Sequence, residues 1–286
     1  MSFGPLDGLV SRHVEVLVTE AGDVLAVRAA GFVVIIKTAT KERKKFLKQE
    51  YDSHCKLAIS SSPFIRKMCD IVGDVEDFDD RSQNHAPCIK PENILVSGLE
   101  NLRPTAKIGD LGLTATDRFN KYQVQPFAMR APEIWRGYGC THRSDVWSLA
   151  AAVLAWAKPG TLGVAGMKGG LWPQLWCMVK LMGVFPGWTA LPATSCMNET
   201  AAIAAKDILG AKDPDRPDEQ YVKVRSLDEE LQSVNISAET ANMLRYLLIT
   251  DPGNRPEAAD ALASPEFQAL VLKVTGYVQS SPRAAM

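Results

Sequence analysis

The sequence predicts an α+β protein with two lobes, a smaller one that contains strands and a larger one that is mainly helical. Three short runs rich in β-branched residues lie before residue 37, whereas the second half carries longer apolar runs at helical spacing. The chain has 286 residues, of which 46% are hydrophobic, and this is enough to bury a large core. We therefore expect one globular domain divided into two lobes.

The first lobe is predicted to begin with an antiparallel meander. Its strands are the β-branched runs at residues 14–18, 24–27 and 32–36, which are separated by turn-like segments containing Gly22 and Gly31. A charged segment with helical spacing follows at residues 41–57, and we expect it to form a helix.

The middle of the chain is predicted to contain two further pieces of β structure. A turn at residues 60–63 precedes a candidate strand at 64–72, and residues 73–87 form an acidic linker. Two short strands then follow at 94–96 and 106–108, joined by a polar loop, as in a hairpin.

The second half is predicted to be helical. Ser144 is expected to be the N-cap of an Ala-rich helix, and a long Pro- and Asp-bearing insertion is expected around residues 207–228. The tail around Ser280–Arg283 is expected to be disordered. The predicted helices lie near residues 145–157, 173–182, 238–249 and 256–270.

Composition narrows the possible partners and location. The formal net charge of -1 gives no reason to expect a nucleic acid or an anionic membrane as the main partner. The six cysteines form no CxxC pair, which is typical of reduced thiols inside a cell. No signal peptide is indicated, and the longest apolar run, residues 146–157, is too short to span a bilayer. A cytoplasmic or nuclear location is predicted.

Two polar residues stand at the ends of the predicted hairpin strands. Asn93 comes directly before the first strand, and Asp110 follows the second. Side by side at the mouth of a short hairpin, they would offer one amide oxygen and one carboxylate, which suits a phosphate-bound Mg²⁺. A lysine, Lys37, ends the strand predicted at 32–36, and Glu50 lies on the helix that follows.

Five segments occur in an order that resembles the eukaryotic protein kinases of the serine/threonine type. They are IKPENIL, DLGL, RAPEIW, SDVWSLA and DPGNRP, and the Arg before Ala-Pro-Glu is similar to the branch that contains the MAP and cyclin-dependent kinases. The resemblance covers residues 32–72 and 88–270. It implies a partial N-lobe at 1–72, a linker at 73–87 in place of the hinge region, a kinase-like C-lobe at 88–270 and a tail at 271–286.

The resemblance also implies a nucleotide site that uses ATP and Mg²⁺. Asn93 and Asp110 would hold the metal ion, and Lys37 paired with Glu50 would hold the α- and β-phosphates. Lys90 would face the γ-phosphate. The implied reaction is phosphoryl transfer to serine or threonine residues of proteins.

Three further residues are implied to have structural roles. Glu133 and Arg255 resemble a buried ion pair that ties the activation segment to the C-lobe. Asp145 resembles the helix aspartate that braces the backbone of the catalytic loop. The activation segment would carry candidate regulatory hydroxyls at Thr114, Thr116 and Tyr122.

The chain departs from the kinase pattern in three places. Cys88 stands where the catalytic aspartate is expected, and a neutral thiol is a poor general base. No glycine-rich GxGxxG loop precedes Lys37. The interval before Cys88 is too short for the hinge and the helix before the catalytic loop, so the chain resembles an internally truncated kinase. Without that helix, the helix at 145–157 is expected to expose apolar side chains, namely Val146, Leu149, Val153 and Leu154.

Three interpretations remain open from the sequence. The chain is a protein kinase with weak activity, a catalytically inactive pseudokinase that acts as a protein-binding scaffold, or a shortened kinase product without function. Retention of Lys37, Glu50, Lys90, Asn93 and Asp110 favours the first interpretation, whereas Cys88 and the missing hinge favour the other two.

Overall fold

The structure is a computed structural model that describes most of the chain. The described residues are 15–18, 24–29, 32–37, 44–68, 89–98, 104–111, 125–168, 170–190 and 196–280. Contacts divide the chain into two compact units, one made of residues 1–61 and 67–83 and the other of residues 62–66 and 84–286. Cys88, Thr114, Thr116 and Tyr122 lie outside the described residues, as does the linker predicted at 73–87.

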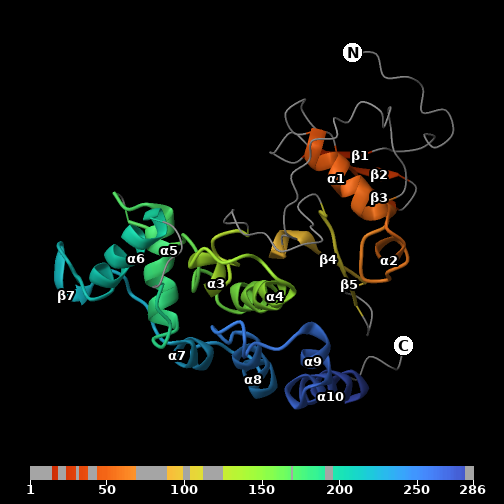
Figure 1. The fold of residues 1–286 in the computed structure, drawn as a ribbon. Helices are drawn as coiled ribbons and strands as arrows, with labels where there is room; N and C mark the ends of the chain where they lie inside the picture. The colour runs from red at the N-terminus through yellow and green to blue at the C-terminus, as the bar shows by residue number, and fades with distance from the viewer. Residues whose placement is uncertain are drawn as a thin grey trace. The chain divides into compact units, whose positions relative to one another are not determined.

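The first unit contains the predicted meander. Strands β1 (Glu15–Val18), β2 (Val24–Ala29) and β3 (Phe32–Lys37) form an antiparallel sheet in that order. The pairing of these strands confirms the three predicted strands (Figure 1). Their β-branched residues favour an extended backbone. Helix α1 (Lys44–Cys55) confirms the charged helix, and the short α2 (Leu57–Ser60) follows it.

The second unit begins with the predicted hairpin. The 3₁₀-helix η2 (Pro91–Asn93) leads into β4 (Ile94–Ser97), which pairs with β5 (Thr105–Ile108) in antiparallel register. The strand predicted at residues 64–72 is wrong for residues 64–68, which carry only one isolated parallel bridge, from Ile65 to Ile108. Residues 69–72 lie outside the described part of the chain.

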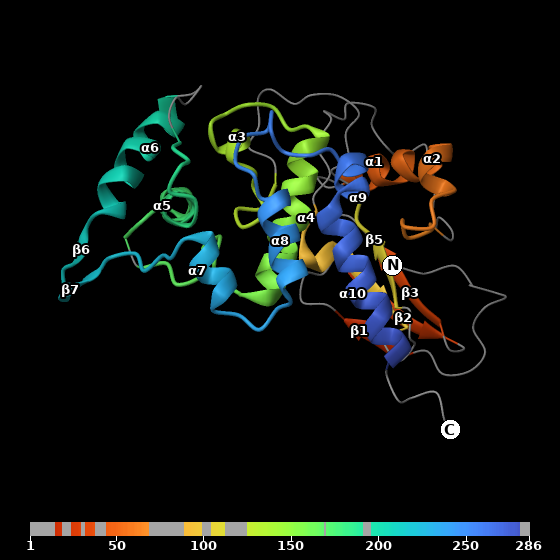
Figure 2. The ribbon, with the colours of Figure 1, turned by 90° about the horizontal axis from the view of Figure 1, so that it is seen from below.

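Helices make up most of the second unit (Figures 1 and 2). The described helices are α3 (Pro132–Trp135), α4 (His142–Ala157), α5 (Pro173–Val184), α6 (Cys196–Leu209), α7 (Leu227–Gln232), α8 (Ala238–Leu247), α9 (Ala258–Ala263) and α10 (Pro265–Ser280). Helix α4 packs against α8 and α9, α5 packs against α6, and α10 packs against α8 and α9. In the chain, a hairpin of β6 (Lys212–Asp213) and β7 (Arg216–Gln220) separates α6 from α7.

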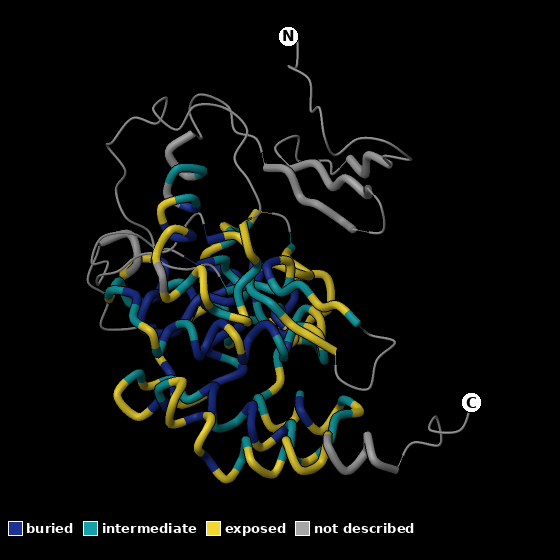
Figure 3. Tube along the Cα trace, turned by 90° about the vertical axis from the view of Figure 1, so that its right-hand side faces the viewer, coloured by how far each residue is buried: buried dark blue, intermediate teal, exposed yellow. Residues whose placement is uncertain are grey.

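The core of this unit is built largely from buried residues of α4 and α5. Figure 3 shows the buried segments gathered in the interior of the unit, with exposed segments around them. Trp147 on α4 and Met178 on α5 are fully buried, and Trp147 packs against Phe185 with ring centroids 5.1 Å apart. Alanines at 150, 151 and 152 let neighbouring backbones approach α4 closely. The Ala-rich segment is therefore the central helix of the unit.

The predicted exposure of α4 is wrong for two of the four residues. Val146 and Leu154 are 7% and 1% exposed, because both point into the core that α4 shares with its neighbouring helices. Leu149 is 43% exposed, and Val153 is partly buried against the core. An apolar strip therefore remains on α4, but it is narrower than the sequence suggested.

Helix boundaries correct three further predictions. Thr141, not Ser144, is the N-cap of α4, and the Ser144 hydroxyl accepts a hydrogen bond from the Thr141 N–H at 3.0 Å. The insertion predicted at residues 207–228 contains the end of α6, the β6–β7 hairpin and the start of α7. The last helix is broken at Pro265 into α9 and α10, and α10 continues to Ser280, beyond the predicted end at residue 270. Residues 281–283 of the predicted disordered tail lie outside the described residues. None of the described helices is long and apolar enough to cross a membrane.

Candidate functional site

The mouth of the β4–β5 hairpin places Asn93 next to the end of β5. Pro91 fixes the first position of η2, and the Asn93 N–H donates to the Lys90 carbonyl oxygen at 3.0 Å. The Gly109 N–H then donates to the Asn93 carbonyl oxygen at 2.8 Å. Asn93 is 6% exposed, so its position is fixed both by its backbone and by packing.

Asp110 follows directly, in a conformation that few residues adopt. Its φ is 57°, in the left-handed region, where Asp and Asn are tolerated better than other side chains. The next residue, Leu111, is buried and anchors the chain beyond the turn. Asp110 itself is exposed, and it directly follows Gly109, whose N–H is bonded to the Asn93 carbonyl oxygen.

These two residues have suitable chemistry for Mg²⁺. Mg²⁺ prefers hard oxygen ligands and is commonly bound through one or two carboxylates together with substrate phosphates and waters. Asn93 and Asp110 each carry a side-chain oxygen of this kind, and both lie at the hydrogen-bonded mouth of the hairpin. Among the residues that the structure describes, no group of three or more His, Cys, Asp and Glu side chains that could hold a metal ion is present.

The predicted pair of Lys37 and Glu50 is only partly described. Lys37 is the last residue of β3, as predicted, and the structure describes its backbone but not its side chain. Glu50 is 6% exposed on α1, and its Oε1 lies 4.0 Å from Nε2 of His54, one helical turn later. Sequence reasoning missed His54, although the spacing of four residues on a helix is a signal for such a pair.

The catalytic-loop residues are likewise described in part. Lys90 precedes η2 in an extended conformation and is half-buried. Lys90 thus lies three residues before Asn93 on the same tight turn. The side chain that replaces the general base, Cys88, is outside the described residues, so its geometry stays a prediction from the sequence.

The ion pair predicted between Glu133 and Arg255 is present and deeply buried. Arg255 is fully buried, and its Nη1 and Nη2 donate to Oε1 and Oε2 of Glu133 at 2.9 Å each. Nε of Arg255 also donates to the Ile249 carbonyl oxygen at 2.8 Å, and its guanidinium lies 5.1 Å from the ring centroid of Trp147. The Ser144 hydroxyl donates to Glu133 Oε1 at 2.7 Å. Every oxygen of the buried carboxylate is thus hydrogen-bonded.

Asp145 on α4 is in a different environment. Its Oδ1 is buried and accepts no hydrogen bond from any residue that the structure describes. Burial raises the pKa of Asp145 to about 7. The resemblance implies that Asp145 braces the backbone of the catalytic loop, of which residues 89–93 are described and Cys88 is not.

Gln125 and Arg130 form a second buried polar cluster that sequence reasoning missed. Gln125 has a φ of 76°, and its side chain accepts from the Ala131 N–H at 3.0 Å and donates to the Ser144 carbonyl oxygen at 3.3 Å. Its carbonyl oxygen accepts from Nη2 of Arg130 at 3.0 Å. The Arg130 guanidinium lies 4.6 Å from the ring centroid of Trp135, and its burial lowers its pKa to about 10. This cluster fixes the end of the segment that leads into α3.

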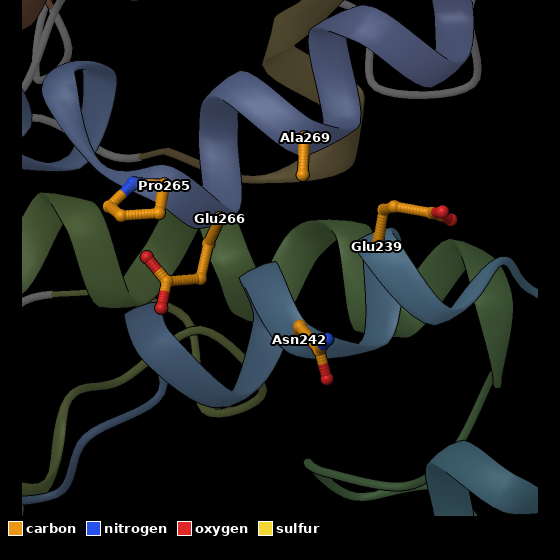
Figure 4. Close-up of a pocket in the computed structure, with 5 residues that line it drawn as sticks. All are labelled: Glu239, Asn242, Pro265, Glu266 and Ala269. Carbon is orange, nitrogen blue, oxygen red and sulfur yellow. The ribbon is translucent and has the colours of Figure 1, made fainter.

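A separate hollow of about 210 Å³ lies between α8 and α10 (Figure 4). It is lined by Glu239, Asn242, Pro265, Glu266 and Ala269. Its two charged residues are both carboxylates, which would repel a polyphosphate. The hollow is therefore no alternative to the hairpin as a nucleotide site.

Comparisons with known proteins assign the chain to no family. No model of a known protein family matches the sequence. No curated protein matches it either.

Proposed function

We propose that the chain is a protein-kinase-like protein that binds Mg·ATP and transfers phosphate slowly to serine or threonine residues of proteins. The observation that carries this proposal is the fixed placement of Asn93 beside Asp110, through the hydrogen bond from Gly109 to Asn93. The buried pair of Glu133 and Arg255 supports it, because a long-range pair of this kind is what the kinase-like motifs imply.

Each retained residue has a physical role in this proposal. Asn93 and Asp110 would hold Mg²⁺, which when bound neutralises charge on the phosphate oxygens. Lys37, positioned by Glu50, would contact the α- and β-phosphates, and Lys90 would contact the γ-phosphate. The positions of these residues would orient the nucleotide for transfer.

Weak activity follows from Cys88. A positioned general base typically contributes a factor of about 10²–10⁴ to the rate, and a thiol with an ordinary pKa of about 8.5 is mostly protonated at neutral pH. Cys88→Asp should therefore raise phosphate transfer from radiolabelled ATP to a library of serine- and threonine-containing peptides by about 10²-fold or more. Cys88→Asn is the matched control, because it is isosteric with aspartate but cannot accept the proton, and it should stay at the wild-type level.

A second candidate function is that of a pseudokinase scaffold, which Cys88 itself favours. In that case the chain binds a protein partner and Cys88→Asp remains inactive, even though its fold is unchanged. If the Cys88→Asp variant binds Mg·ATP but transfers no phosphate to the peptides, the enzymatic proposal is overturned and the scaffold function remains.

A further inference from the structure

Arg66 lies beside the mouth of the β4–β5 hairpin. Its N–H donates to the Ile108 carbonyl oxygen at 3.0 Å, and the Ile108 N–H donates to the Phe64 carbonyl oxygen at 2.8 Å. Residues 64–66 therefore run parallel to the end of β5, within the same compact unit as the hairpin. This pairing places Arg66 beside Ile108, which is two residues before Asp110 in the chain.

The side chain of Arg66 lies over Gly109. A Cβ atom at Gly109 would be 3.8 Å from Nε of Arg66 and 3.3 Å from Cδ1 of Leu95. Glycine thus leaves room for the arginine to lie against the hairpin at the residue whose N–H is bonded to Asn93. The guanidinium group is charged at every physiological pH, so a fixed positive charge lies close to the proposed metal ligands.

We propose that Arg66 binds the phosphates of the nucleotide at the Asn93–Asp110 site. This inference rests on the proposed function, and it adds to Lys37 and Lys90 a third phosphate contact, from a residue outside the kinase-like motifs. The planar guanidinium donates two parallel hydrogen bonds to phosphate oxygens, and such charge-assisted bonds are stronger than neutral ones.

The charge balance of the site favours this role. The sequence has no glycine-rich loop whose backbone N–H groups could surround the phosphates. Mg·ATP remains negatively charged after the metal has bound, and Asp110 adds a further negative charge beside it. A cation beside the hairpin therefore offsets a repulsion that no glycine-rich backbone loop relieves.

The test is isothermal titration calorimetry on the full chain with two ligands, Mg·ATP and magnesium tripolyphosphate. Arg66→Gln should weaken both ligands by about 10- to 100-fold, since it removes a charge-assisted contact to phosphate. Lys67→Gln is the matched control, because it makes the same change of charge at the next residue, which is exposed, and it should stay within about twofold of the wild type. Arg66→Lys keeps the charge but loses the planar guanidinium, so it should bind both ligands with intermediate affinity. This variant provides the test if Arg66→Gln does not fold.

Each other outcome overturns the inference in a distinguishable way. If the wild type binds Mg·ATP and both Arg66 variants bind equally well, the role of Arg66 is wrong and the proposed function stands. Tighter binding by Arg66→Gln would mean that Arg66 obstructs the site. If ATP is weakened but tripolyphosphate is not, Arg66 contacts the nucleoside and not the phosphates. A wild type that binds neither ligand would overturn the inference and the proposed function together.

Discussion

Replacing Arg255 by alanine tests the long-range pair that links α3 to the loop before α9. The substitution removes two hydrogen bonds of 2.9 Å to Glu133, one of 2.8 Å to the Ile249 carbonyl oxygen and one of 2.9 Å to the Arg143 carbonyl oxygen. It leaves the Glu133 carboxylate buried without its cation. Breaking a buried pair in this way costs about 3–5 kcal/mol, a large part of the total stability of an ordinary domain, about 5–15 kcal/mol.

Urea unfolding followed by circular dichroism measures this cost directly. Arg255→Ala should lower the free energy of unfolding by about 3–5 kcal/mol, whereas Arg255→Lys should lose less because it keeps the charge. Arg245→Ala is the control, since Arg245 forms an exposed ion pair of 2.6 Å with Asp228 and such pairs contribute about 0–1 kcal/mol. A loss below about 1 kcal/mol for Arg255→Ala would refute the reasoning, because it would show that the buried carboxylate does not need the guanidinium.

Two further predictions concern the buried polar groups near α4. Burial raises the pKa of Asp145 to about 7, so the folded protein binds more protons than the unfolded chain between about pH 4 and pH 7, and stability falls as the pH rises through this range. Asp145→Asn should remove a decline of up to about 3 kcal/mol in the unfolding free energy between pH 4.5 and pH 8; an unchanged decline would mean that Asp145 has partners that keep it charged. Gln125→Gly should destabilise less than Gln125→Ala in thermal melts, because both lose the side-chain hydrogen bonds but glycine relieves the φ of 76°; the reverse order would show that the backbone is not strained there.

Local patterns in the sequence were sufficient to predict the hairpin and the central helix. Asn93 and Asp110 were predicted at the mouth of a hairpin because each flanks a short β-branched or apolar run, and the observed register confirms that hairpin. The Ala-rich run of α4 was also predicted, although its start was placed three residues late. Thr141, followed three residues later by Ser144, was the available signal for the true N-cap.

Features that depend on distant residues could not be predicted in this way. Arg66 reaches the candidate site only because residues 64–66 pair with β5, and a single parallel bridge has no periodic signature in the sequence. The left-handed conformation of Gln125 is maintained by contacts to Ala131 and Ser144, and glutamine has no preference for it. Burial of Val146 likewise depends on the helices that pack around α4.

Helix α6 is a different case, because its signal was present and was overlooked. Ala201, Ala202 and Ala205 are buried and recur at helical spacing. The following segment was predicted only as a Pro- and Asp-bearing insertion around residues 207–228, and several of its prolines and aspartates belong to the β6–β7 hairpin. Pro265 similarly marks the break between α9 and α10.

Mg-dependent binding of ATP tests the proposed function most directly. The measurement is a thermal-shift titration of the wild type and of Asp110→Asn with ATP, with and without Mg²⁺, and Asp218→Asn is the control because Asp218 is exposed on β7. At about 100 times the dissociation constant, binding should stabilise the wild type and the control by about 2.7 kcal/mol, and only when Mg²⁺ is present. Asp110→Asn should lose this stabilisation. A cooperative melt of the wild type that Mg·ATP does not shift would contradict the proposal that Asn93 and Asp110 form a nucleotide site.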